Sequence, residues 1–423
     1  MKKGIVVIAG ASALAAFGMW FTQHSYQTAV ADALERNADS YQDLGIDIQK
    51  SDLASSFVSL EDVYTVTLTE QFFEDLDLPD LYGESFDVTI NNVCSVYPFY
   101  MSCHNEISLP DDVIPEDIVE KINGFSYDTG WSFSPLTNSV SSYVNTSKFT
   151  LDNEGDPVKF EALTMTSNSD LAFEQLTIDL NWGGMAVSES YSNMSIGNLS
   201  LNADMTLLSG ITYIGTSSVT VDDIQLGSVN GESFSADTIT VSSASSEYET
   251  DKYDVQYYVN SPAMAINGGL MPVELTELSM DIRLFGLSEK ALEMMNSFQN
   301  NGASEQEVLT NMLNEMGKNE PGFVINDFST SVNGVPVSLN GEITFDSFTA
   351  NDIDTGEIAA KSNAQVNASV GKDVASALPQ LVPILEQYTQ MGMATKDSEG
   401  NYTTEITIKD RTLSANGTVL QQF

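Results

Sequence analysis

The chain is poor in the residues from which most active sites are built. It has two histidines and two cysteines among 423 residues, and no G-x-S-x-G sequence. A Ser-His-Asp or Cys-His hydrolase would have to use His24 or His104, and neither has a supporting motif. No second histidine or cysteine pair supplies the ligand spacing of zinc, and glycine-rich phosphate loops are missing. The sequence therefore predicts no catalytic residue, no metal site and no cofactor.

Basic residues are also scarce, with 16 Lys and Arg against 60 Asp and Glu, a formal net charge of −44. This field repels phosphate backbones, so we expect no nucleic-acid partner, and it disfavours flat docking on anionic lipid headgroups. Acidic pairs are too common to be informative. The stretches 152–156 and 352–357 resemble calcium loops only faintly and are interpreted as turns. A carboxylate-dependent hydrolase stays an alternative, because its two acids could lie anywhere in the chain.

Only one stretch near the start is long, apolar and uncharged, from Gly4 to Phe21. As a helix it would be roughly 27 Å long, about the thickness of a bilayer core. Lys2 and Lys3 precede it and an acidic chain follows, so the sequence predicts a single-pass anchor in the bacterial inner membrane with the bulk of the chain in the periplasm. A cleaved signal peptide is the alternative, with A-x-A-like sites at 13–15 and 29–31. Both interpretations place the remainder outside the cytoplasm.

Period-two alternation dominates after a helical, amphipathic segment over 24–41. Alternation with one wet face is typical of antiparallel sheet, so the fold is expected to be mainly β, with extended antiparallel sheets and a few helices. Asn340-Gly341 is interpreted as a hairpin turn, and Glu154-Gly155, Asn230-Gly231 and Glu399-Gly400 as further turns. The clearest predicted strands cover residues 176–182, 199–207, 253–259, 278–284, 335–339 and 343–345.

Helices are expected late in the chain. Ser288 can cap a helix over 288–298, and Ser304 with Glu307 forms a capping box for a second over 304–316, which together make a helical hairpin. A third helical stretch over 374–391 should be kinked or divided by Pro379 and Pro383. The domain organisation predicted is an N-terminus and anchor (1–23), a stalk helix (24–41), a β-rich region (42–266) and a β-plus-helix region (267–423).

Cys94 and Cys103 are the only cysteines and lie close together. In an oxidising compartment such a pair is expected to form a disulfide across a turn. A redox role is poorly supported because the pair lacks C-x-x-C spacing.

The apolar sheet face must be covered by something. Two sheets packed together would close it, whereas a partly covered sheet would leave an apolar trough suited to acyl chains. In the second case the segment around Pro379 and Pro383 could act as a lid over the ligand; otherwise it is a buried core helix. The apolar side chains of this candidate lid are Leu378, Leu381, Val382, Ile384 and Leu385.

Several stretches resemble the YdgA-like family of bacterial envelope proteins, which is defined by a domain of unknown function. They are the start Met1-Lys2-Lys3 with one hydrophobic helix, the amphipathic segment to Tyr41 followed by residues 54–57 and 64–68, the strand-then-helix stretch 274–295, and the closing hairpin 401–417. The early His-Gly-Pro stretch that members often carry is replaced here by Asn91-Asn92-Val93-Cys94, so the resemblance assigns no role to these residues. The resemblance implies inner-membrane attachment and self-association, and no reaction.

These observations leave three hypotheses for function. The first is a noncatalytic binding or scaffold protein with an apolar groove for lipid. The second is a self-associating, homo-oligomeric structural protein without a ligand, and the third is a carboxylate-dependent hydrolase. An uncovered apolar sheet face would favour the first hypothesis, a flat apolar patch the second, and two converging carboxylates in a cleft the third.

Overall fold

The computed structural model describes residues 2–43, 45–75, 85–108, 122–151, 157–188, 192–210, 212–228, 231–268, 272–296 and 305–423. The chain forms two compact units. The first consists mainly of Met1–Gly183 with Leu201–Tyr213, and the second mainly of Gly184–Ser200, Ile214–Phe298 and Gly302–Phe423. The predicted organisation as mainly antiparallel β structure with a few helices is confirmed, and every pairing with a described register is antiparallel.

The first unit begins with one continuous helix, α1 (Lys2–Asp43), which covers both the predicted anchor and the predicted stalk segment. Its part from Gly18 onward packs on the sheet of this unit, and Tyr26 is 2% exposed. A Cβ on Gly18 would lie 2.8 Å from the Cβ of Pro98, so glycine allows the helix to approach the turn at Pro98-Phe99 closely. Among the helices that the structure describes, none is long and apolar enough to cross a membrane.

The sheet of the first unit is an antiparallel array in the order β1-β2-β3-β4-β6-β7-β10-β11, which β14 extends next to β11. A short helix, α2 (Glu70–Asp75), follows β2, and the short strands β5, β8 and β9 pair in the order β5-β8-β9. The strands are β1 (Ile46–Ser55), β2 (Ser59–Leu68), β3 (Phe86–Tyr97), β4 (Tyr100–Ser108), β5 (Ile122–Asn123), β6 (Tyr127–Ser134), β7 (Ser139–Thr146), β8 (Phe149–Leu151), β9 (Val158–Phe160), β10 (Leu163–Ser169), β11 (Gln175–Trp182) and β14 (Leu199–Ser209).

The core of the first unit lies between α1 and strands β2, β3, β4 and β6. Its buried members are Tyr26, Leu60, Cys94, Val96, Met101, Cys103 and Phe133. The predicted disulfide is present, because Cys94 and Cys103 face each other across the β3–β4 hairpin and are bonded. Both cysteines are therefore part of the surface on which α1 packs.

Replacing both cysteines by alanine (Cys94→Ala with Cys103→Ala) is expected to lower the free energy of unfolding of the first unit by about 2–3 kcal/mol. The bond closes a short loop, and its removal returns entropy to the unfolded chain. Urea unfolding can be followed by tryptophan fluorescence, since Trp20, Trp131 and Trp182 all lie in this unit. Treating the parent with a reductant should give the same loss. Two free thiols in the isolated parent would contradict the bond.

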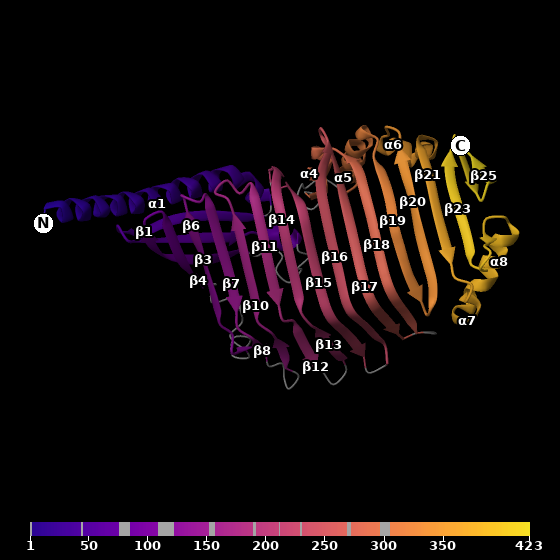
Figure 1. Cartoon of the computed structure of the whole chain (residues 1–423), viewed down its shortest axis with the longest axis horizontal. Coiled ribbons are helices and arrows are strands. Elements are labelled where there is room, and N and C mark those ends of the chain that lie inside the picture. Colours follow the sequence, from indigo (N-terminus) through magenta and orange to yellow (C-terminus); the bar gives the residue numbers. More distant parts are fainter. Residues whose placement is uncertain are drawn as a thin grey trace. The chain divides into compact units, whose positions relative to one another are not determined.

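The second unit is a sheet of antiparallel strands in the order β12-β13-β15-β16-β17-β18-β19-β20-β21-β23-β24-β25, with β22 beside β23 (Figure 1). The strands are β12 (Met185–Ser188), β13 (Ser192–Ile196), β15 (Thr212–Ser228), β16 (Ser233–Glu249), β17 (Lys252–Asn267), β18 (Val273–Leu287), β19 (Gly322–Val332), β20 (Val335–Phe345), β21 (Ser362–Val370), β22 (Thr395–Lys396), β23 (Tyr402–Lys409), β24 (Thr412–Ala415) and β25 (Thr418–Gln422). The predicted boundary between the two β-rich regions, at residues 266 and 267, falls inside β17, and residues 269–271 lie outside the described residues.

One predicted turn is wrong. Asn340-Gly341 lies inside β20, and the hairpin turn is instead Asn333-Gly334, whose φ angles are 50° and 81°. A Cβ on Gly341 would lie 2.4 Å from the carbonyl oxygen of Gln365, so this glycine serves close strand packing. The turn at Glu399-Gly400 is confirmed, with Gly400 at φ 93° and its N–H donating to Asp397. Glu154-Gly155 and Asn230 lie outside the described residues.

Short helices gather at one end of strands β16–β20, and others lie beside the C-terminal strands (Figure 1). Ser288 caps its helix as predicted, because its hydroxyl accepts from the Ala291 N–H at 3.1 Å. The predicted division of the 374–391 segment is also confirmed, with a 3₁₀ turn that starts at Pro379. Ser304 lies outside the described residues. The helices are α4 (Glu289–Asn296), α5 (Glu305–Met316), η2 (Gly317–Asn319), α6 (Ala350–Asp354), η3 (Glu357–Lys361), α7 (Val374–Ala377), η4 (Pro379–Leu381) and α8 (Val382–Gln390).

Candidate apolar binding sites

One face of the second unit's sheet carries a continuous row of apolar side chains. The strand register places one such residue opposite the next across seven consecutive strands: Val219, Val241, Val259, Met280, Phe328, Leu339 and Ala368. Neighbouring strands are about 4.8 Å apart, so the row is about 29 Å long. We call this surface the apolar sheet face.

Flanking rows on the same face are also mainly apolar. One joins Tyr257, Ile282, Ile325, Gly341, Val366 and Ile406, and another joins Val255, Leu284, Phe323, Ile343, Ala364 and Ile408. None of the seven side chains of the central row is buried, and Val241 is 42% exposed. A second packed sheet would bury such a row. Within the described part of the chain, therefore, no second layer covers the central row, whereas Val255 in a flanking row is 6% exposed.

The opposite face of the same strands is polar. Its central row is Thr220, Thr240, Asn260, Ser279, Ser329, Ser338, Ser369 and Thr403. Hydroxyl pairs such as Ser218–Ser242 and Thr220–Thr240 hydrogen-bond across strands at 2.8 and 3.2 Å. The sequence alternation thus separates one wet face from one apolar face.

The predicted lid segment lies at the C-terminal edge of the apolar sheet face, beside β21 and β23. Leu385 lines a cavity of about 310 Å³ together with Ala368, Tyr388 and Ile406. The five apolar side chains of the predicted lid have different surroundings. Leu378 is buried beside Val374 in a small core, against which Val382 and Leu385 pack. The other two, Leu381 and Ile384, are 38% and 47% exposed. The lid role itself stays a prediction. Because Ala368 belongs both to the central row and to this cavity, the two apolar surfaces are continuous.

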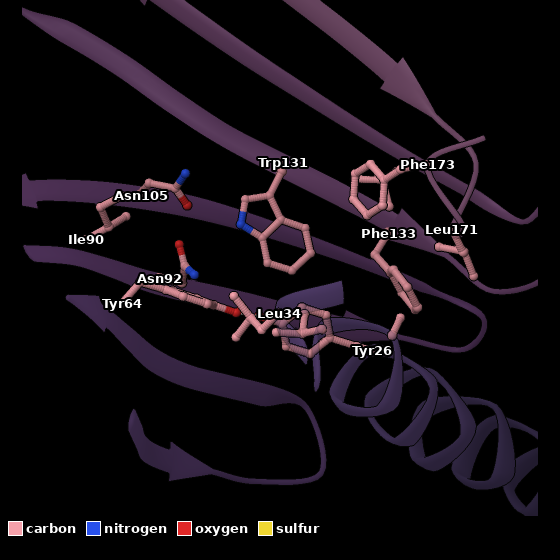
Figure 2. Close-up of a pocket in the computed structure, with 13 residues that line it drawn as sticks. Tyr26, Leu34, Tyr64, Ile90, Asn92, Asn105, Trp131, Phe133, Leu171 and Phe173 are labelled. Carbon is pink, nitrogen blue, oxygen red and sulfur yellow. Dashed lines mark hydrogen bonds between the residues drawn. The ribbon is translucent and has the colours of Figure 1, made fainter. Parts of the chain in front are cut away.

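The first unit has a separate cavity of about 300 Å³ between α1 and the sheet (Figure 2). Its walls are mostly aromatic and aliphatic, and they come from α1, from strands β2, β3, β4, β6 and β7, and from the segment after β10. The lining residues are Tyr26, Ala29, Val30, Leu34, Tyr64, Ile90, Asn92, Asn105, Trp131, Phe133, Val140, Leu171 and Phe173. Its volume is at the lower end of small-molecule sites, which span about 300–1,000 Å³.

A buried carboxylate anchors one wall of this cavity. Asp62 has no exposed surface and accepts hydrogen bonds from the Tyr26 hydroxyl at 2.8 Å and the Asn92 amide at 3.0 Å. The Lys50 ammonium lies 3.4 Å from it. Burial, and then the neighbouring Tyr64 and Asp62, raise the pKa of the Tyr26 phenol well above its usual value. Tyr26 therefore stays protonated and keeps donating to the carboxylate.

The cavity contains unused hydrogen-bond acceptors. Asn92 and Asn105 are cross-strand neighbours, and the side-chain oxygens of both are buried without a hydrogen-bond partner. In Figure 2 these two oxygens point toward each other. The Asn92 amide cannot turn over, because its nitrogen must donate to Asp62. The Asn105 amide turned over by 180°, or an occupant with an N–H or O–H donor, would satisfy this oxygen, whereas a carboxylate would not.

The other residues considered from the sequence have ordinary surroundings. His104 lies in β4, where its Nδ1 is 3.2 Å from Asp128, and both side chains are more than half exposed. Asp352 lies in α6, and the predicted turn follows at Thr355-Gly356, where Gly356 has a φ angle of 78°. Asp352 pairs with Lys361 at 2.8 Å, and hydrogen bonds from Lys361 and Thr349 lower its pKa. Among the described residues, no group of three or more His, Cys, Asp or Glu side chains could hold a metal ion.

Residues 94–421 match the model of a family described as "Bacterial protein of unknown function (DUF945)". The chain belongs to this family. The predicted family is thereby confirmed, and the DUF945 match includes every strand of the apolar sheet face. No curated protein and no solved structure matches the chain.

Sequence reasoning found the alternation that builds the apolar sheet face but missed the cavity under α1. Tyr26, Val30 and Leu34 were visible as a helical stripe. Trp131 and Phe133, two residues apart on β6, carried the complementary signal. Asp62 gave none, because it was one acid among 60.

Proposed function

We propose that this protein is an inner-membrane-attached protein of the bacterial envelope that binds lipid acyl chains without catalysing a reaction. The observation that carries the proposal is the apolar sheet face, a row about 29 Å long that no second layer of the described chain covers. Large exposed apolar surfaces mark ligand grooves, membrane contacts or protein–protein interfaces more often than ordinary protein surface. The uncharged sequence Gly4–Phe21 between two lysines and an acidic chain supports attachment with the bulk of the chain in the periplasm.

A self-associating structural protein is the second candidate. The C-terminal strand β25 pairs only with β24 in the described chain, and Val419, Leu420 and Phe423 are 56%, 39% and 40% exposed. An apolar edge strand of this kind can pair with a second copy. A carboxylate-dependent hydrolase has no comparable support, because the buried Asp62 already pairs with Lys50, Tyr26 and Asn92.

Two adjacent tyrosines provide a matched test of lipid binding. Tyr257 and Tyr258 lie on β17, are 36% and 41% exposed, and point to opposite faces of the sheet. Tyr257→Asp is expected to reduce the lipid that copurifies with the gently extracted protein roughly tenfold, which corresponds to about 1.4 kcal/mol of binding free energy. Tyr258→Asp should leave the lipid content unchanged, because its side chain lies on the polar face.

Mass spectrometry of extracted lipid gives the lipid-to-protein ratio. Lipid bound to the N-terminal helix is the same in both variants and cancels in the comparison. Equal ratios in the two variants, or no lipid in the parent, would count against the proposal. A parent that is lipid-free and dimeric, with Tyr257→Asp monomeric, would favour self-association through the same face.

A further inference from the structure

Three hairpin turns of the first unit lie at the same end of its sheet. The hairpins β1–β2, β3–β4 and β6–β7 are neighbours in the antiparallel order β1-β2-β3-β4-β6-β7, so their turns share one edge. The Ser134 hydroxyl of the third turn donates to the Phe99 carbonyl of the second at 3.3 Å, and the Val96 N–H donates to Val58 of the first at 2.9 Å.

Helix α1 passes these turns at the point where its apolar run, Gly4–Phe21, ends. The Phe99 N–H donates to the Gly18 carbonyl at 3.4 Å, and the Thr22 hydroxyl donates to the Tyr97 carbonyl at 3.3 Å. The next residue, Gln23, donates from its side-chain amide to the Ser56 carbonyl at 2.6 Å. The C-terminal end of the Gly4–Phe21 run is therefore level with the three turns.

The tips of these turns carry large apolar side chains where turns usually carry small polar ones. The exposed ones are Phe57, Val58, Tyr97, Tyr100 and Leu136, with exposures of 50%, 60%, 53%, 42% and 73%, and we call this set the turn rim. Trp20 on the adjoining helix is 54% exposed. None of them fills the core, so folding alone does not explain their presence.

Charge is distributed unevenly between the two ends of the sheet. Residues 53–60, 94–103 and 129–146, which contain the three turns, include no charged residue, although the chain has 60 acidic ones. Helix residues 14–31 have none either. At the opposite ends of the same strands lie Asp47, Asp87, Glu106 and Asp128. An acid-free end on a protein of net charge −44 is the only end of this sheet that anionic headgroups would not repel.

We propose that the turn rim inserts into the interfacial region of the lipid bilayer, so that the first unit sits directly on the membrane. Tyrosine and tryptophan favour this region because their rings are apolar and their polar groups stay hydrated. Membrane attachment by α1 alone would leave the unit free to tilt, whereas three inserted turns fix its orientation. The inference rests on the membrane attachment proposed above but not on lipid binding by the apolar sheet face.

The test uses the full chain reconstituted in phosphatidylcholine–phosphatidylglycerol vesicles, with an environment-sensitive fluorophore on one introduced cysteine. The native cysteines are bonded and do not compete for the label. Leu136→Cys places the label on the turn rim. Lys148→Cys is the control, because it follows β7 (Ser139–Thr146) at the end opposite the β6–β7 turn, about 26 Å away along the strand.

The label at 136 is expected to shift its emission to the blue and to be quenched by lipids with a spin label near the headgroup, while the label at 148 shows neither effect. Vesicle flotation separates the two proposals. If the protein floats but the label at 136 behaves like the label at 148, the insertion of the turn rim is overturned, and membrane attachment still stands. Protein that does not float overturns attachment itself. A blue shift that depends on protein concentration and shows no lipid quenching would identify a second copy as the occupant and overturn the inference.

Discussion

Replacing Asp62 by alanine is expected to lower the free energy of unfolding of the first unit by about 3–5 kcal/mol. The substitution removes one partner of a buried ion pair and the acceptor for both Tyr26 and Asn92. Removing one member of such a group costs more than the group contributes when intact, because the remaining polar atoms stay buried with fewer partners. Asp62→Asn should cost less, since one oxygen remains to accept a hydrogen bond.

Glu61 is the matched control because it is the preceding residue on β2 and is exposed. Glu61→Ala should change stability by no more than about 0.5 kcal/mol, as is usual for surface positions. Urea titration followed by tryptophan fluorescence measures both variants in the first unit alone. If Asp62→Ala were as stable as Glu61→Ala, the buried network would not exist as described.

Patterns within the sequence predicted the helices, strands and breaks that are determined by interactions between nearby residues. Strict alternation over 199–207 correctly predicted β14, the Ser288 hydroxyl predicted the start of α4, and Pro379 predicted the break before α8. In each case the deciding interaction is made within a few residues. The same alternation predicted an apolar sheet face, although it did not decide whether a second layer covered it.

Features that depend on distant neighbours could not be predicted in this way. Asn340-Gly341 has the composition of a turn, but its glycine is required by the approach of Gln365 from the next strand. The burial of Asp62 depends on Tyr26, 36 residues earlier, and on Asn92, 30 residues later. Likewise, the stretch between Cys94 and Cys103 was recognised only as a disulfide loop, since its proximity to α1 arises from the fold.

The cavity under α1 gives the second large expected effect. Phe133 is 2% exposed, contacts the Tyr26 ring edge-on with centroids 5.8 Å apart, and forms part of the cavity wall. Phe133→Ala should lower the free energy of unfolding by about 3–5 kcal/mol, because it removes a large buried ring and enlarges a cavity that cannot collapse fully. Leu136→Ala, three residues further along and 73% exposed, is the control and should change stability by no more than about 0.5 kcal/mol.

The enlarged cavity should also make the Phe133→Ala variant responsive to small apolar molecules. Benzene is a suitable probe, since engineered apolar cavities bind it. At about 100 times its dissociation constant, benzene would restore about 2.7 kcal/mol by binding the folded state alone. The parent, whose cavity is smaller, should gain less, and Leu136→Ala should behave like the parent. The measurement is the urea midpoint of each variant with and without benzene. If Phe133→Ala is destabilised and benzene does not restore its stability, the space beneath α1 closes when the ring is removed.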